Sequence, residues 1–179
     1  MCSGHVLAVR RPAYRGGMPK HSVQPPEWID GAPIRVTESV DIAASPSAVW
    51  AHIVDHESWP EWFTALDSVE RIGSGDGVGS GRRVVAMRLP LDEEFTAWDV
   101  DEHFAFAVTA SKIVTLDTLA ESVRLEQIDG GTRVTYRQGV QGKPGLGWAM
   151  RLLWKRPAGQ LADAVQQLKL RIESESESG

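Results

Sequence analysis

The stretch that most constrains this fold is residues 45–62, which combines a helix start with three tryptophans. Ser45 can cap a helix, and Pro46 fits a first turn, where no amide donor is needed. A second short helical turn is expected around residues 57–62. Apolar side chains recur at helical spacing on one face of the first helix: Val49, Trp50, Ile53 and Val54. Because so much aromatic surface must press on a large apolar interior, we expect the two helices to clamp one edge of a curved sheet.

Alternation of apolar and polar residues predicts seven strands, with the two short helices inserted after the first. In 82–89 the inward face is either Val84, Ala86 and Arg88 or Val85, Met87 and Leu89. The last two strands form a hairpin joined by Asp129-Gly130-Gly131. The expected strands are 34–42, 67–72, 82–89, 94–100, 104–110, 116–127 and 132–140.

A long helix is predicted over residues 146–172, with Leu152, Leu161, Val165, Leu168 and Ile172 at helical spacing. Pro157 removes an amide donor and should kink this helix or split it in two. We expect one domain over residues 34–173. Residues 1–33 read as a flexible basic extension and 174–179 as a disordered acidic tail. Met18 is an alternative start, so residues 1–17 need not be present in the native protein.

The net charge of −5 argues against nucleic acid as the main partner, because neutralising phosphates needs a basic surface. Cys2 is the single cysteine, so no internal disulfide can form and a reducing cytoplasm is the simpler location. No apolar run approaches the roughly 18 residues that span a bilayer. We expect a cytoplasmic monomer or weak homodimer.

Four segments together resemble a known family: SVDIAASPSAVWAHIVDHESWPEW, GVGSGRR, GGTRVTY and the closing LADAVQQLKLRIE. They are similar to the SRPBCC (START-like, helix-grip) superfamily, in its polyketide cyclase/dehydrase and lipid transport branch. The resemblance covers residues 34–172. It implies an α+β helix-grip fold, a seven-stranded curved antiparallel sheet around a long C-terminal helix. It also implies an elongated cavity that binds a hydrophobic small molecule without cofactor or metal.

Two carboxylates interrupt apolar strand faces, and a tyrosine shares the inward face of the last hairpin. Glu121 and Glu38 must each be paired, protonated or open to a wet cavity, because an unpaired buried charge is costly. They are candidate acid/base or ligand-anchoring residues, as is Tyr136. The alternative is a structural ion pair, with Arg88 as a candidate partner, or a position on the solvent-facing rim.

The wall of the expected cavity combines strand alternation with the register that the resemblance implies. In 94–100 that register favours Trp98 and Val100 as inward residues, with Phe95 competing. The expected wall residues are Trp62, Met87, Trp98, Phe106, Glu121, Val123, Tyr136, Trp148 and Leu152. Tryptophan at helical or strand spacing also suits an ordinary core.

Two further patterns are weaker. His52 and His56 share helical spacing, but no third histidine or cysteine is nearby, so we expect solvated surface histidines and no metal site. The glycine-rich residues 73–81 lack a dinucleotide fingerprint and a following helix. We expect instead a mobile loop over the pocket mouth.

The sequence and the family resemblance together suggest three candidate functions. The first is cofactor-independent binding of a lipid, polyketide or similar hydrophobic molecule, as a carrier or sensor. The second is a cyclase/dehydratase that uses Glu121, Tyr136 and Glu38 on a poly-carbonyl substrate. It ranks lower, because the sequence shows no dense polar constellation. The third is a toxin-like or regulatory protein that contacts a macromolecular partner.

Overall fold

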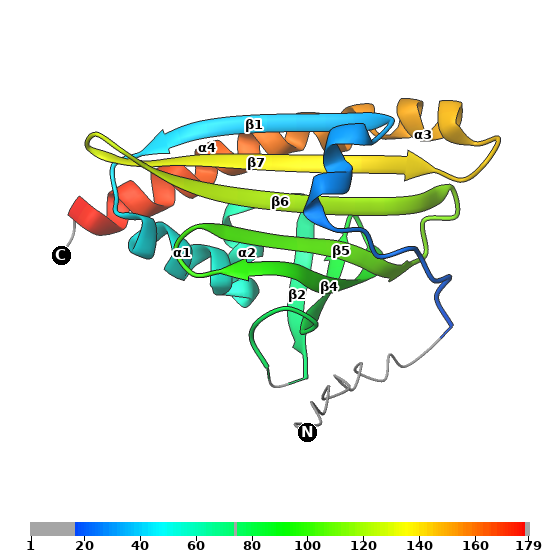
Figure 1. Cartoon of the computed structure of the whole chain (residues 1–179), viewed down its shortest axis with the longest axis horizontal. Coiled ribbons are helices and arrows are strands. Elements are labelled where there is room, and N and C mark those ends of the chain that lie inside the picture. The colour runs from blue at the N-terminus through cyan, green and yellow to red at the C-terminus, as the bar shows by residue number, and fades with distance from the viewer. Residues whose placement is uncertain (1–16, 74, 178–179) are drawn as a thin grey trace, which may run out of the picture.

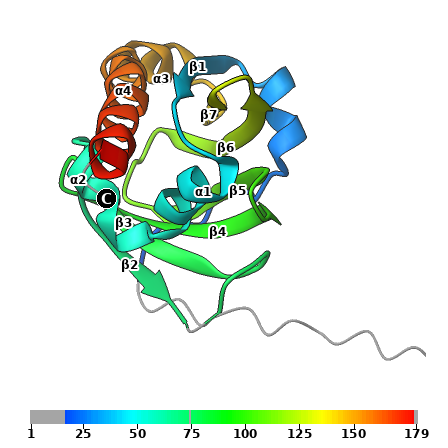
Figure 2. The same cartoon turned by 90° about the vertical axis from the view of Figure 1, so that its left-hand side faces the viewer.

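A computed structural model describes residues 17–73 and 75–177, which form one curved antiparallel sheet gripping a long helix (Figure 1). The strand order is β1-β7-β6-β5-β4-β3-β2, so the first strand pairs with the last. The sheet curls around α4, and α1 closes one end of the curl (Figure 2). The expected helix-grip architecture is confirmed. The strands are β1 Ile34–Ile42, β2 Leu66–Ile72, β3 Gly81–Ala86, β4 Leu89–Asp99, β5 His103–Ser111, β6 Leu116–Ile128 and β7 Gly131–Gly142.

The two short helices and the turn between them, residues 46–62, are called the clamp, and the first helix begins at the predicted residue. In α1 (Pro46–Val54), Ser45 Oγ accepts a hydrogen bond from the amide of Ala48 at 3.3 Å. A 3-10 turn, η2 (His56–Ser58), leads into α2 (Trp59–Trp62). The indole of Trp59 donates to the carbonyl of Ile53 at 2.9 Å, which fixes α2 against α1. The clamp therefore presents its tryptophans to the interior of the sheet.

The C-terminal helix is divided, as the proline predicts. α3 (Gly147–Leu153) and α4 (Lys155–Glu177) meet at Trp154. Pro157 lies in the first turn of α4 and has no amide hydrogen to give to the preceding turn. After the break, α4 buries a continuous apolar face against the sheet: Leu161, Ala164, Val165, Leu168 and Ile172.

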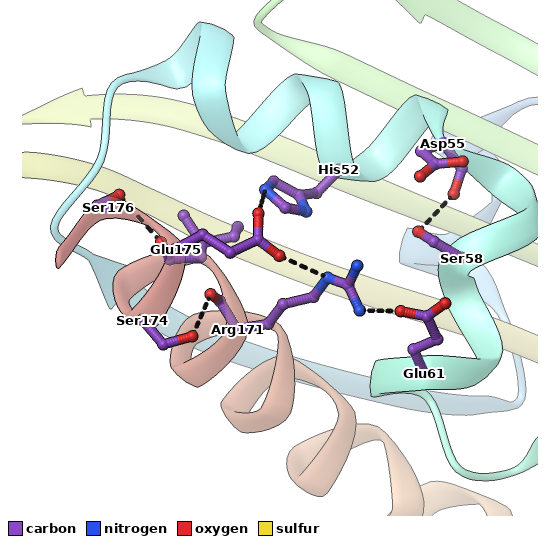
Figure 3. A network of polar contacts seen from close by, with 9 residues as sticks. His52, Asp55, Ser58, Glu61, Arg171, Ser174, Glu175 and Ser176 are labelled. Carbon is purple, nitrogen blue, oxygen red and sulfur yellow. Dashed lines mark hydrogen bonds and ion pairs between the residues drawn. The ribbon is translucent and has the colours of Figure 1, made fainter. Parts of the chain in front are cut away.

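Charged side chains hold the far end of α4 against the clamp (Figure 3). Arg171 forms an ion pair with Glu61 of α2 and lies 3.2 Å from Glu175. Glu175 also approaches His52 of α1, at 3.5 Å. This network is partly exposed, so its contribution to stability is modest.

Ordered structure continues beyond residues 34–173 at both ends. Residues 26–31, assigned to a flexible extension, form a 3-10 helix, η1 (Pro26–Gly31), that packs on the outer face of the sheet. Its Ile29 is buried against Ala107 and Ala120, which supplies the apolar contact that orders this segment. Residues 1–16 lie outside the described part of the chain. At the other end, α4 runs through the expected tail to Glu177, with Ser176 bonded to the carbonyl of Ile172 at 3.0 Å.

The predicted strand 82–89 is wrong at its end. β3 stops at Ala86, and Met87 and Arg88 form a two-residue hairpin turn with φ of 49° and 66°. Such a turn needs positive φ at both positions, and the residue types give no sign of it. A bulge between Phe95 and Ala97 changes the alternation of β4, so Phe95 and Trp98 both contact the core.

Candidate functional site

A cavity of about 70 Å³ lies between the concave face of the sheet and the helices α2 and α4. Most of its wall is apolar, and includes Trp59, Phe63, Leu91, Phe106, Leu119 and Trp154. A site for one water needs roughly 10–15 Å³ of such space, so this cavity has room for several waters or a small organic fragment. Its position matches the interior that the resemblance implies.

Glu121 forms the polar centre of the wall. It is buried on β6, directly opposite Gln138 of β7. Tyr136, also on β7, is two residues before Gln138 and faces the same side of the sheet. Tyr136 donates its hydroxyl hydrogen to Oε2 of Glu121, and the amide of Gln138 donates to Oε1 at 2.8 Å. Both carboxylate oxygens are thus satisfied by neutral donors.

Burial makes this carboxyl titrate near neutrality. Loss of solvent, and to a smaller extent the nearby Glu93, raise the pKa of Glu121 to about 7, although the bonds from Tyr136 and Gln138 oppose the rise. The pKa of Tyr136 is also raised well above its ordinary value, by burial and by Glu121. Glu121 therefore exists in both protonation states at neutral pH, and Tyr136 stays neutral.

The polar centre is connected to the helix break. Trp154, at the junction of α3 and α4, donates its indole N–H to Oε1 of Gln138 at 2.8 Å. This bond orients the Gln138 amide so that its nitrogen faces Glu121. A hydrogen-bonded chain therefore runs from the helix junction through β7 to the carboxyl on β6.

A second polar cluster centres on the buried Arg82 of β3. Its Nε donates to Glu93 of β4 at 2.7 Å, and its Nη1 lies 3.2 Å from Nδ1 of His56. The guanidinium stacks on Trp59, 3.9 Å from the ring centroid, and lies 4.5 Å from that of Phe106. Arg82 and Glu93 both line the cavity, so a buried ion pair forms part of its wall.

The neighbours of Arg82 have shifted pKa values. Burial and the guanidinium charge lower the pKa of His56 to about 2, so the imidazole is neutral. Burial raises the pKa of Glu93, and the charge of Arg82 opposes the rise. Because His56 is neutral, its Nδ1 can accept from Arg82, which leaves the proton on Nε2.

One more polar atom lines the cavity. Within residues 17–73 and 75–177, Oε1 of Gln160 is buried without a hydrogen-bond partner, and Gln160 lies on the cavity wall. A buried acceptor without a donor is costly, so this oxygen is a natural contact for a hydroxyl or water inside the cavity.

The structure separates the predicted wall residues into three groups. Met87, Phe106, Glu121 and Tyr136 line the cavity. Trp62, Trp98 and Val123 contribute to the core elsewhere. The assignments of Trp148 and Leu152 are wrong: their side chains are 72% and 63% exposed, because Met150 is the α3 residue buried beneath that helix.

The remaining candidates lie away from the cavity. Glu38 is half-buried on the edge strand β1 and does not line the cavity. Arg88 lies in the β3–β4 turn, where its amide bonds to Asp67, so it is not the partner of Glu121. The described residues of the glycine-rich segment do not line the cavity, and the mobile loop over the pocket mouth stays a prediction.

The histidine pair needs a partial correction. His56 is fully buried, not solvated, because the η2 turn carries it under the clamp towards Arg82. His52 is half-buried, with its Nε2 3.5 Å from Glu175. No group of three or more metal-ligating side chains occurs in the part of the chain that the structure describes.

Sequence reasoning missed most of the polar wall. Gln138 could have been predicted from the sequence, because it stands two residues after Tyr136 and therefore faces the same side of the strand. Arg82 and Glu93 were not, because each stands in a run of charged residues (Arg82-Arg83 and Asp92-Glu93-Glu94) where no pattern says which one faces inward. The burial of His56 depends on a tertiary contact that spacing does not indicate.

Comparison with known families gives a match over nearly the whole described domain. The model of the family described as polyketide cyclase / dehydrase and lipid transport matches residues 33–173. An uncharacterized protein of Mycobacterium tuberculosis, Rv2574, is 32% identical over 112 residues. That match covers 61% of this chain and 66% of the relative, slightly less than two thirds of its length.

Solved structures share the fold at low identity. TTHA0849 from Thermus thermophilus has a TM-score of 0.67 at 20% identity, covering 80% of this chain and 99% of that one. A START superfamily protein from Mycobacterium smegmatis has a TM-score of 0.63 at 16% identity, over 78% and 97%. The di-domain ARO/CYC StfQ from the steffimycin biosynthetic pathway has a TM-score of 0.69 at 8% identity, over 84% and 54%. No helix in residues 17–73 and 75–177 is long and apolar enough to cross a membrane.

Proposed function

This chain belongs to the polyketide cyclase / dehydrase and lipid transport family, and on that premise we propose that it binds a mostly apolar small molecule in the cavity. The molecule carries a hydroxyl or carbonyl group, which meets Glu121 and Tyr136 at the buried end. Binding needs no cofactor. The protein would serve as a carrier or sensor for this ligand.

The observation that carries the proposal is a polar cluster set into an otherwise apolar wall. A pocket of this composition buries the body of a ligand and fixes its orientation at a few polar contacts. The protonated carboxyl of Glu121 can donate to a carbonyl, and the ionised form can accept from a hydroxyl. The unpartnered oxygen of Gln160 offers a second acceptor to a ligand hydroxyl.

The cavity is too small for a lipid or polyketide unless its wall moves. An engineered cavity of about 150 Å³ binds benzene, and this cavity is about half that size. A lipid or polyketide must therefore displace part of the wall. Met87 is the wall residue that can move most easily, because its flexible side chain is 45% exposed and lies on a hairpin turn.

Fluorescent fatty-acid and naphthalene probes test this proposal by titration. We expect micromolar binding to the wild type and at least about tenfold weaker binding to Ala86→Phe, which fills the cavity from β3. Ala97→Phe is the matched control, because Ala97 is half-buried on β4 outside the cavity. Binding by neither the wild type nor the control, or equal binding by all three proteins, would refute the proposal.

A second candidate function, a cyclase/dehydratase, is favoured by the pKa of Glu121. A carboxyl that titrates near 7 beside a neutral tyrosine suits proton transfer to and from an enolisable carbonyl. The polar cluster is also denser than the sequence indicated. The two functions separate in Glu121→Gln: an enzyme would lose turnover of a poly-carbonyl substrate while still binding it, whereas a carrier would show no turnover in either form.

A further inference from the structure

The surface of α3 is apolar and open to solvent. Trp148, Leu152 and Leu153 are all exposed, although α3 is only two turns long. Trp148 and Leu152 stand four residues apart and so share one face of the helix. Exposed large apolar side chains gathered in this way mark an interaction site.

A neighbouring loop extends the apolar surface. The amide of Lys143, just before α3, donates to the carbonyl of Thr115 at 2.9 Å, which holds the β5–β6 loop beside the start of α3. Val114 in that loop is 71% exposed. In Figure 1, α3 and the β5–β6 loop lie at the same end of the molecule. We call Val114, Trp148, Leu152 and Leu153 the α3 surface.

Basic residues surround the α3 surface, although the chain as a whole is acidic. No aspartate or glutamate occurs between Asp129 and Asp163. Asp117, at the start of β6, is the acidic neighbour of the loop, and it accepts a hydrogen bond from Gln141. The basic residues are Lys112, Lys143, Arg151, Lys155 and Arg156, and all but the half-buried Lys143 are exposed.

The α3 surface also adjoins the cavity. Ile113, next to Val114, lines the cavity, and so do Trp154 and Pro157, which follow α3 directly. A partner seated on the α3 surface would therefore lie next to one side of the cavity wall.

We propose that the α3 surface docks on an anionic lipid bilayer. Trp148 and the leucines insert at the level of the lipid headgroups, while the flanking lysines and arginines pair with anionic headgroups. Charge complementarity favours this occupant over a second copy of the chain, because a two-fold contact through the α3 surface would bring the same basic residues together. The proposal does not depend on the identity of the cavity ligand.

Co-sedimentation with vesicles tests the proposal. We expect binding to phosphatidylcholine vesicles that contain phosphatidylglycerol, little binding to phosphatidylcholine alone, and weaker binding at high salt. Lys155→Glu should weaken binding by about tenfold or more, because it reverses one surface charge. Trp148→Ser combined with Leu152→Ser should weaken it at least as much.

Matched controls come from the opposite end of the sheet. Val100 is an exposed apolar residue and Arg124 an exposed basic one, and both lie near the start of α1. Val100→Ser and Arg124→Glu should leave vesicle binding unchanged. Absence of a preference for anionic vesicles, or an equal loss in variants and controls, would overturn the proposal. It would also be overturned by self-association in sedimentation velocity that Trp148→Ser abolishes, since a second copy would then be the occupant.

Discussion

The hydroxyl of Tyr136 on β7 donates a hydrogen bond to Oε2 of Glu121 on β6, inside a wall that is otherwise mainly apolar. The two residues lie on adjacent strands, two positions out of direct register. The rigid sheet therefore holds the pair in place without help from a loop. This contact, with the bond from Gln138, keeps the pKa of the buried carboxyl from rising further.

Removing the phenol hydroxyl should therefore raise the pKa of Glu121 above about 7. We predict that Tyr136→Phe moves the titration midpoint of the ¹³C-labelled Glu121 carboxyl upward in an NMR pH series. Gln138→Leu should act in the same direction, because it removes the donor to the other oxygen. An unchanged or lower midpoint in both variants would show that these bonds do not stabilise the ionised form.

Glu121 and His56 make opposite contributions to the pH dependence of stability. Glu121 keeps its proton in the fold between its ordinary pKa of 4.5 and about 7, so its contribution is lost as the pH rises through that range. His56 stays neutral in the fold between 6.5 and about 2, so its contribution is lost as the pH falls below 6.5. Between pH 4.5 and 6.5 the two effects largely cancel.

Each substitution should therefore reveal the effect of the other group. We predict that Glu121→Gln, in which only His56 still titrates, gains about 2 kcal/mol of unfolding free energy, relative to the wild type, as the pH rises from 4.5 to 6.5. His56→Gln should lose a similar amount over the same range, and its amide can still accept from Arg82. Urea denaturation at several pH values measures both changes. If the free energy of unfolding depended on pH in the same way in all three proteins, the pKa shifts assigned to Glu121 and His56 would be contradicted.

Arg82 and Glu93 form a buried pair whose members depend on each other. Arg82→Met leaves the Glu93 carboxyl buried without its partner and should destabilise the fold by about 3–5 kcal/mol. The double variant with Glu93→Leu should recover much of this loss, since no isolated charge remains. A double variant less stable than Arg82→Met alone would contradict this reading.

Arg171 provides the matched control for that experiment. It also pairs with a glutamate, but Glu61 is more than half exposed (Figure 3). Arg171→Met should therefore cost no more than about 1 kcal/mol in the same urea measurement. Equal losses at Arg82 and Arg171 would mean that burial does not decide the strength of these pairs.

The packing of η1 on the sheet depends on Gly139 of β7. A Cβ at this position would lie 3.0 Å from the Cβ of Ala32 and 3.1 Å from the Cα of Ile29. We predict that Gly139→Val displaces η1 and increases amide hydrogen exchange in residues 26–32, while β7 remains paired. Unchanged protection of residues 26–32 would show that this contact does not hold η1.

The sequence specified the fold more completely than the site, for physical reasons. Ser45-Pro46, the strand alternation and Pro157 act through local geometry, so they could be interpreted one by one. Alternation also marked Glu121 and Tyr136, because each interrupts or extends an apolar face. The positions of Met87 and His56 depend on a turn and a tertiary contact without local signals. The exposed position of Trp148 differs from the prediction because hydrophobicity alone does not distinguish a helix that is buried in the core from one with an apolar exposed face.

Native mass spectrometry of the protein purified from its own cells tests the central claim most directly. The account predicts an additional mass, released on unfolding, that corresponds to a mostly apolar molecule bearing oxygen. It also predicts that the adduct persists in Ala97→Phe and is absent in Ala86→Phe, where the cavity is filled. The unliganded mass alone in the wild type, or an adduct retained equally in both variants, would contradict the claim that this cavity holds a ligand.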